Sequence, residues 1–583
     1  MNIRLGKHSS SGQPIGINSE NLRTHLHLIG ATGSGKTSAI HVILRQLMLQ
    51  RGRDRSCIFV FDPLGNLAKD LLRIMAYERY SPQSVRDRLV YIEPANSQSI
   101  STFNPLIHTD EANRYYQTMR AVELVLRAWD AQDPAQQPRL LQWMTNAFIS
   151  AAMVGFPISI CRFLIHPGTP EHDAIVNRLP EETAQRWKQI LRSGGSEAMR
   201  ILESTRNRLD PFFRSPNLKL MFGVPESRFD CEELIRERKI VIINLAEKDK
   251  IPGFICDTIG SLYLNEIFQT ANRLAVTEGV AAVNPTYLFL DEFHRYVSRD
   301  VERALPTVRQ MGLRMAFAHQ SFAQLEREEV DLSQMIWQAR TRLAFANYAD
   351  DADFLADKLG KLTYDDMEIK DKRMTKRQLV DGFTRETTHS HSDTSGFSDS
   401  KGESRGENDG THSGFNYVSG SFSPTSSSRG SSSGESQGRS ESSASSASST
   451  RTTSEQLVPN HVTFEEIASL TYRSFDEHSI RWNQRIQSLG PGEAFLQQPG
   501  SRDVAPIQME FLRVPDSKAI DDKVEAMLEK NFSSPYFISM ENAERQHEAC
   551  INNLLSGKPI YVGAEPSHSE PSEAPDDNGP FKL

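Results

Sequence analysis

Residues 30–37, GATGSGKT, have the residue types and spacing of a phosphate-binding loop, G-x-x-x-x-G-K-[ST]. Gly33 and Gly35 lack the Cβ that would prevent backbone N–H groups from approaching phosphate oxygens closely. We expect Lys36 to reach the β- and γ-phosphates of a nucleotide, and the Thr37 hydroxyl to bind Mg²⁺. This pattern predicts a nucleotide-binding site close to the N-terminus.

The residues on either side of the loop support this prediction. Apolar residues 26–29 predict a buried strand before it, and apolar positions between 40 and 47 fall on one face of a helix after it. A chance glycine-rich turn is the alternative, but it does not explain a strand before and a helix after. The residues expected to contact ATP are Gly30, Ala31, Thr32, Gly33, Ser34, Gly35, Lys36, Thr37 and Ser38.

A second acidic motif follows the apolar run 287–290, which predicts a buried strand. Asp291 and Glu292 stand at its carboxyl end, where ligand crevices lie in open parallel sheets. Asp291 is placed to hold Mg²⁺ opposite Thr37, and Glu292 to polarise the attacking water as a general base. The alternative is an exposed acidic pair that ends a strand; the nearby phosphate loop favours the catalytic interpretation.

Two further polar residues follow Asp291. Arg309 is predicted in the helix after Asp291, and Gln320 at the end of the strand MAFAHQ. A glutamine there can sense the γ-phosphate, and an arginine can stabilise transition-state charge in its own site or in a neighbour's. From spacing alone, Arg309 fits a solvated surface position equally well.

Composition limits the class of protein. The chain has 583 residues and a net charge of −9, which excludes a uniformly basic nucleic-acid protein but not a motor with a basic channel. Five scattered cysteines without a CxxC pair indicate a reducing compartment and no structural zinc site. The N-terminus lacks the apolar region of a signal peptide, and residues 147–160 are too short to span a bilayer. We expect a cytoplasmic protein without an integral membrane segment.

Strands alternating with helices predict an α/β fold with a mostly parallel sheet. Helical periodicity without strands predicts an all-α insertion, and a Ser/Gly-rich stretch predicts disorder because it buries too little apolar surface. The predicted parts are 1–109 (first part of the ATPase core), 110–234 (all-α insertion), 235–386 (second part of the core), 387–456 (disordered insert), 457–515 (return to the core) and 516–583 (helical segment and acidic disordered tail).

Together these motifs resemble the HerA/FtsK group of P-loop ATPases, and within it the cytoplasmic part of type IV secretion coupling proteins of the TraG/TraD conjugative transfer type. The resemblance rests on NLRTHLHLIGATGSGKT, FDPLGNL, FNPL, YLFLDEFHRYV and VRQMGLRMAFAHQSFAQL, and it covers about residues 21–360. It implies a RecA-like core, a homo-hexameric ring and transport of double- or single-stranded DNA.

The resemblance also assigns residues and partners. It implies that Arg309 enters the neighbouring subunit's site in trans and that Gln320 is the sensor residue. The all-α insertion would help to select DNA and a relaxase or other secretion-system partner. Coupling proteins usually begin with transmembrane helices; their absence before residue 21 makes a DNA-processing or defence motor an equal expectation to conjugative export.

Three functions remain open at the level of sequence. The first is an ATP-driven, Mg²⁺-dependent DNA translocase. The second is an ATPase that delivers protein or nucleoprotein cargo to a type IV secretion pore. The third is a nucleotide-gated scaffold that recruits an effector nuclease. Stimulation of ATP hydrolysis by DNA separates the first from the third, and cargo binding through residues 110–234 identifies the second.

Overall fold

The computed structural model describes residues 2–106, 111–127, 138–192, 195–247, 251–283, 285–296, 299–327, 330–395 and 447–558. The chain forms two compact units, Met1–Asp366 with Ser474–Leu583, and Met367–Arg473. The predicted disorder of the Ser-rich centre, residues 396–446, and of the acidic tail after residue 558 lies outside the described residues.

An 11-stranded sheet organises the first unit. Its strands, in spatial order, are β2 (Pro14–Asn18), β1 (Asn2–His8), β16 (Val504–Met509), β15 (Glu493–Gln497), β12 (Thr341–Ala344), β3 (Leu26–Ile29), β9 (Leu313–His319), β8 (Thr286–Leu290), β4 (Cys57–Asp62), β7 (Ile240–Asn244) and β5 (Leu89–Ile92). From β12 to β5 all neighbours are parallel, which confirms the predicted α/β fold with a mostly parallel sheet.

The parallel strands are buried on both faces. Every residue of β3, β4, β7, β8 and β9 is buried, as continuous apolar runs in a covered sheet require. Two separate apolar cores contain helices such as α1 (Lys36–Met48) and α2 (Asn66–Ala76) on one side and α12 (Gly253–Thr277) on the other. The sheet therefore lies between two helical layers.

The other edge of the sheet is antiparallel, and part of it was not predicted. Strands β1 and β2 form an N-terminal hairpin, and β1 pairs with β16 from near the opposite end of the chain. The sequence contains only short alternating runs there: Ile3, Leu5 and Ile17 are buried, whereas the residues between them are mostly exposed or half-buried. Residues 2–18 are thus part of the same 11-stranded sheet as the parallel strands.

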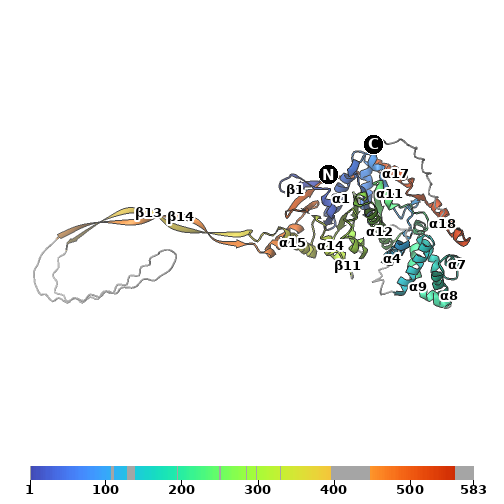
Figure 1. The fold of residues 1–583 in the computed structure, drawn as a ribbon. Coiled ribbons are helices and arrows are strands. Elements are labelled where there is room, and N and C mark those ends of the chain that lie inside the picture. The colour runs from blue at the N-terminus through green and yellow to red at the C-terminus, as the bar shows by residue number, and fades with distance from the viewer. Residues whose placement is uncertain are drawn as a thin grey trace, which may run out of the picture. The chain divides into compact units, whose positions relative to one another are not determined.

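The described part of residues 111–236 contains helices and no strand, as predicted for the all-α insertion. The helices are α4 (Glu111–Arg127), α5 (Pro138–Met153), α6 (Cys161–Leu164), α7 (Pro170–Val176), α8 (Glu181–Arg192), α9 (Gly195–Arg214), α10 (Pro216–Met221) and α11 (Cys231–Arg236). Figure 1 shows α7, α8 and α9 grouped together. Within the described residues, none of the helices combines the length and apolar character needed to cross a membrane.

Two C-terminal helices form the predicted helical segment. One packs on the all-α insertion and the other on the edge of the sheet. Helix α18 (Met540–Leu555) packs on the insertion, where His547 Nδ1 lies 2.9 Å from the Gly223 carbonyl oxygen and Arg178 donates to the carbonyls of Asn553 and Leu554. Helix α17 (Lys518–Phe532) covers β5, the outermost strand of the parallel half.

A single side chain closes the edge of β5. The Asn531 amide accepts a hydrogen bond from the Tyr91 N–H (2.8 Å) and donates one to the Tyr91 carbonyl (3.0 Å), as a neighbouring strand would do. Asn531 is 5% exposed, so water is largely excluded from both hydrogen bonds. Helix α17 therefore protects an edge that would otherwise be open to pairing with another chain.

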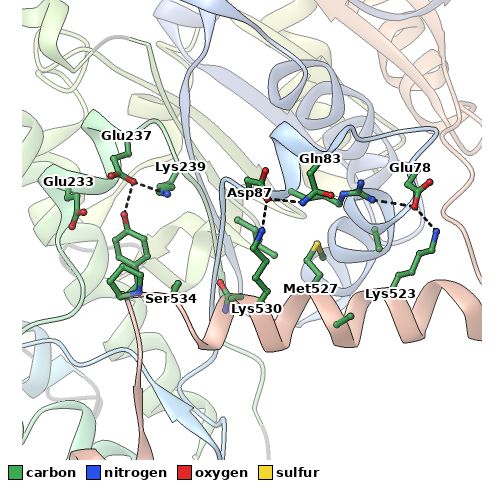
Figure 2. A pocket seen from close by; sticks show the side chains of 17 residues that line it. Glu78, Gln83, Asp87, Glu233, Glu237, Lys239, Lys523, Met527, Lys530 and Ser534 are labelled. Atoms are coloured by element: carbon green, nitrogen blue, oxygen red, sulfur yellow. Dashed lines mark hydrogen bonds and ion pairs between the residues drawn. The ribbon is translucent and has the colours of Figure 1, made fainter.

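Charged residues surround this contact. Figure 2 shows the pocket of about 500 Å³ that α17 forms with α3 (Gln83–Arg86), its neighbours and the end of α11. Lys523 pairs with Glu78 (2.9 Å), and Lys530 with Asp87 (2.8 Å). The charged side chains that line the pocket thus form ion pairs with one another, and these ion pairs connect α17 to the core.

The second unit is a two-stranded antiparallel ribbon, β13 (Ile369–Ser395) with β14 (Ala447–Tyr472), which we call the arm. Helix α15 (Ala349–Thr363) precedes it, and α16 (Phe475–Gln487), which packs on α15, follows it. Residues 387–395 and 447–456, expected to be disordered, are paired strand, and residues 367–386 and 457–473, expected in the core, belong to the arm. Backbone pairing forms this ribbon without the apolar burial on which the disorder prediction depended.

Replacing Asn531 with alanine should destabilise the first unit. The change leaves the buried N–H and C=O of Tyr91 without partners, at a cost of about 1–3 kcal/mol. Chemical denaturation should show a lower midpoint. Lys523→Ala on the same helix removes only an exposed ion pair and should change the stability by less than about 1 kcal/mol. Equal effects of the two substitutions would contradict the proposed role of Asn531 at the β5 edge.

Candidate nucleotide-binding site

The predicted phosphate loop connects β3 to α1 and is fixed from two sides. The Ala31 N–H donates to the Ala346 carbonyl just after β12 (2.8 Å), and the Gly492 N–H just before β15 donates to the Ser34 carbonyl (2.9 Å). Gly35 has φ 116°, and a Cβ on it would lie 3.0 Å from the Gly492 Cα. Glycine at position 35 is therefore required both by its dihedral angle and by a neighbouring backbone.

The loop offers unused donors where a phosphate is expected. The Ser34 hydroxyl is buried without a hydrogen-bond partner in the described part of the chain. Among the described residues, the backbone N–H groups of Thr32, Gly33 and Gly35 have no backbone acceptor. Gly33 has φ 78°, and a Cβ built there meets nothing within 4 Å. Free N–H groups at the start of a helix suit an anion, so the residues fit a nucleotide phosphate.

Lys36 lies within this loop and is 8% exposed. Its ammonium donates to the carbonyls of Gly30 (2.5 Å) and Ala31 (3.2 Å). Burial lowers the pKa of Lys36, while the charges of Glu292 and Asp291 act in the opposite direction. The predicted cation thus lies at the phosphate loop, close enough to both predicted carboxylates for their charges to raise its pKa.

Asp291 and Glu292 follow β8 at the carboxyl end of the sheet, as predicted, and each is 8% exposed. Burial raises the pKa of Asp291 to about 7, and the negative charges of Asp62 and Glu292 add to this rise. Glu292 has φ 45°, a left-handed conformation that is uncommon for residues other than glycine and is often found at functional sites.

Glu292 has a different electrostatic environment from Asp291. Burial raises the pKa of Glu292, but hydrogen bonds from His294 and Gln320 and the charges of His294 and Lys36 lower it below its usual value. His294 Nδ1 lies 3.3 Å from Glu292 Oε2. Of the two neighbouring carboxyl groups, Glu292 is therefore the one kept ionised across the neutral range.

Gln320 joins the phosphate loop to Glu292. Its Nε2 donates to Glu292 Oε1 (2.8 Å), and its Oε1 accepts from the Thr32 hydroxyl (2.8 Å). One amide side chain thus contacts both the tip of the loop and the predicted general base.

A buried chain of hydrogen bonds supports the strand that carries Gln320. Arg342 Nε donates to His27 Nδ1 (3.0 Å), and His27 Nε2 lies 2.7 Å from His319 Nε2. His319 Nδ1 in turn lies 3.0 Å from the Ser321 carbonyl. Because arginine only donates, His27 carries its proton on Nε2 and His319 on Nδ1, so the chain is directional from β12 to the residue after Gln320.

Burial keeps both histidines neutral, as that chain requires. It lowers the pKa of His319 to about 3 and that of His27 well below its usual value. Both rings are fully buried and stack at 5.0 Å between centroids. No local sequence pattern marks these two histidines, because only the register of β3 against β9 brings them together.

Arg309 does not join this site within one chain. It lies in turns after α13 (Arg299–Ala304) rather than in a helix, and its side chain is exposed. Gly312 with φ 79° just before β9 accounts for the turn. Arg309 precedes β9 whereas Gln320 follows it, so the strand separates them by about 20 Å at 3.3 Å per residue.

Two contributors were missed by sequence reasoning. Asp62 ends β4, next to β8, and its carboxylate accepts from the N–H groups of Leu64 (2.9 Å) and Ala68 (2.7 Å). An aspartate at the end of a second buried strand was the available signal for it. Gly492 had no comparable signal, because its role depends on a contact between distant segments.

Comparisons with known proteins agree with this geometry. Residues 3–267 match the family model of the helicase HerA central domain. Residues 285–405 match the family model TraG-D_C, described as the TraM recognition site of TraD and TraG. The first match contains the phosphate loop, and the second contains Asp291, Glu292 and Gln320. A comparison with curated proteins gives no match.

Solved structures of low sequence identity are also similar. The bacterial conjugative coupling protein TrwBdeltaN70 in its unbound monoclinic form has 14% identity over 87% of this chain and 89% of its own, with a TM-score of 0.43. The plasmid coupling protein TrwB with the ATP analogue ADPNP has 14% identity over 88% and 91%, with a TM-score of 0.45. VirB4 of Thermoanaerobacter pseudethanolicus has 15% identity over 61% and 86%, with a TM-score of 0.38.

Removing the charge of Glu292 should separate nucleotide binding from hydrolysis. Glu292→Gln keeps an acceptor for Gln320 but loses the base, so we expect hydrolysis to fall by about a hundredfold or more with binding retained. Lys36→Ala should weaken binding itself. Fluorescent-nucleotide titration together with phosphate release measures both quantities. A Glu292→Gln protein that fails to bind would place Glu292 in the binding site rather than in the chemical step.

Neutralising Asp291 should change how the stability of the nucleotide-free protein depends on pH. Its pKa is raised to about 7, so folding binds a proton between about pH 4 and pH 7 and the free energy of unfolding falls as the pH rises through that range. Asp291→Asn removes this contribution. Denaturation of both proteins at pH 5 and pH 8 should show the asparagine variant gaining more relative stability at pH 8. An identical difference at both pH values would contradict the raised pKa.

Proposed function

Because the chain belongs to the HerA/FtsK-type P-loop ATPases, we propose that it is a Mg²⁺-dependent, cytoplasmic motor that hydrolyses ATP and moves DNA as a homo-hexamer. The observation that carries this proposal is the Gln320 bridge between the phosphate loop and Glu292. A residue that touches both can link the presence of the γ-phosphate to the position of the base. Such a link is what a motor needs and a passive nucleotide-binding protein does not.

The residues of this chain divide the work of hydrolysis. The backbone N–H groups of Thr32, Gly33 and Gly35 and the Lys36 ammonium bind and orient the phosphates. Glu292, held ionised, accepts a proton from the attacking water, and Gln320 orients Glu292 and senses the γ-phosphate. Thr37 and Asp291 would hold Mg²⁺, whose charge neutralises the phosphate oxygens. The surrounding burial excludes bulk water and strengthens each of these interactions.

We assign Arg309 a role in trans. Its exposure and its place before β9 keep it from its own phosphate loop but leave it free to meet a neighbour's. An arginine supplied by a neighbour makes hydrolysis depend on assembly, because the transition-state charge is stabilised only between subunits.

Conjugative transfer, DNA processing and defence are the candidate pathways of the motor. The family model matched by residues 285–405 takes its name from recognition of TraM by TraD and TraG, which favours an accessory protein partner in conjugative DNA transfer. Delivery of a relaxase or another nucleoprotein cargo to a secretion pore would use the same ATPase. The alternative to a motor is a nucleotide-gated scaffold that recruits an effector nuclease.

The ATPase rate with and without double-stranded DNA tests the proposal. A motor should hydrolyse ATP faster on DNA, and the stimulation should decline steeply with salt because the contacts are to phosphates. Glu292→Gln is the blank, and single-stranded DNA of equal length tests strand preference. A rate that is abolished in the blank yet indifferent to both DNAs would reject the translocase and favour protein cargo or a scaffold.

A further inference from the structure

The arm has two open strand edges. Strands β13 and β14 pair with each other from Ile369 with Tyr472 to Ser395 with Ala447, over 27 and 26 residues. Within the described residues neither has a second partner strand, and Figure 1 shows them side by side along their length. Each outer edge therefore presents a long row of backbone N–H and C=O groups without strand partners, and a lone two-stranded ribbon is marginally stable in water.

The arm also exposes apolar side chains. It holds more than half of the large hydrophobic residues that are exposed in the described chain. Leu379 is 61% exposed, Phe383 is 63% exposed and Leu457 is 59% exposed. Exposed apolar side chains concentrated on one ribbon indicate an interaction site, because soluble monomers seldom leave large apolar patches uncovered.

The charges of the two strands identify what pairs with them. Residues 369–386 of β13 contain six Lys or Arg and three acidic residues, whereas residues 455–472 of β14 contain three Glu and no Lys or Arg. Within the ribbon, the opposite charges of the two strands form ion pairs. Arg377 pairs with Glu466 at 3.2 Å, and Arg385 with Glu455 at 3.9 Å. A basic strand would accept a second acidic strand on its other side equally well.

We propose that the arm joins copies of this chain, with the outer edge of β13 in one copy pairing with the outer edge of β14 in the next. Pairing of like edges would place basic strands beside basic strands and acidic beside acidic, which is unfavourable. The opposite edges make a head-to-tail contact, and such a contact repeated around a rotation axis closes a ring. Each copy then covers both of its open edges, and the apolar side chains gain neighbours.

This inference rests on the proposed function only in taking the motor to be a ring, and its test needs no ATP hydrolysis. If the arms assemble but DNA does not stimulate the ATPase, the proposed motor function is wrong and the proposed interface is supported. If DNA stimulates the ATPase while arm substitutions leave assembly unchanged, the proposed interface is wrong and the proposed motor function is supported.

Charge reversal on the full-length chain supplies the first test. One variant changes β13 by Lys372→Glu, Lys376→Glu and Arg377→Glu; a second changes β14 by Glu455→Lys, Glu465→Lys and Glu466→Lys; a third combines all six. Each single-strand set should raise the concentration at half-assembly about tenfold or more, and the combined set should restore it because the edges are again complementary. Mass photometry at low salt measures the distribution of species.

A matched control separates this effect from a general change of charge. Arg502→Glu, Arg513→Glu and Lys518→Glu reverse the same number of exposed cations outside the arm and should leave assembly unchanged. A wild-type protein that stays monomeric at all concentrations would overturn the proposal. Assembly that withstands both single-strand sets would also overturn it, and would indicate that a different kind of molecule covers the arm.

Cysteine cross-linking tests which edges meet. All five native cysteines are buried, so engineered thiols on the arm can be addressed selectively. Chains with Thr384→Cys on β13 are mixed with chains carrying Thr453→Cys, Thr463→Cys or Ser469→Cys on β14, and treated with a short bis-maleimide. Covalent dimers that form in mixtures but not from either chain alone would support the proposal. Dimers of the β13 variant alone would show pairing of like edges and overturn it.

Discussion

Parallel pairing of β3 with β9 and of β9 with β8 ends all three strands at the same edge of the sheet, and the candidate site depends on this register. The phosphate loop follows β3, the carboxylate pair follows β8, and Gln320 follows β9. A slip of one residue in any strand would turn these side chains to the other face. Close packing of the strand side chains against helices on both faces opposes such a slip, because a shifted side chain no longer fits its neighbours. The packed core and the chemistry are therefore specified together.

Within this frame, polar groups are buried in an arrangement that keeps neighbouring carboxyls in different states. Asp62 and Asp291 lie where burial raises the pKa of each, while hydrogen bonds and nearby cations keep Glu292 ionised. The two histidines that link Arg342 to Ser321 are neutral and add no charge of their own to this crowded region. They fix the end of β9 by hydrogen bonds alone, which a low-dielectric interior makes strong.

Local patterns in the sequence predicted most of the core and site but few of the long-range contacts. Apolar runs and motif spacing predicted strands β3, β8 and β9 of the parallel half, and Lys36, Asp291, Glu292 and Gln320 follow the ends of these strands. The N-terminal hairpin, Gly492 and Asn531 were missed because each acts through a partner hundreds of residues away. The arm was assigned to disorder at its distal parts because backbone pairing between distant polar segments leaves no apolar periodicity.

The hydrogen bond from Gly492 to the phosphate loop also sets an order of events during synthesis. A ribosome adds about 5–20 residues per second, so roughly 20–90 s pass between translation of the loop and translation of the segment that fixes it. Until Ala346 has been synthesised the nascent loop has neither support, and from Ala346 to Gly492 it has one. Strand β1, although paired with β2, lacks its other partner β16 over the whole interval. The nucleotide site is therefore completed only after the segment that carries Gly492 has been synthesised, hundreds of residues after the loop itself.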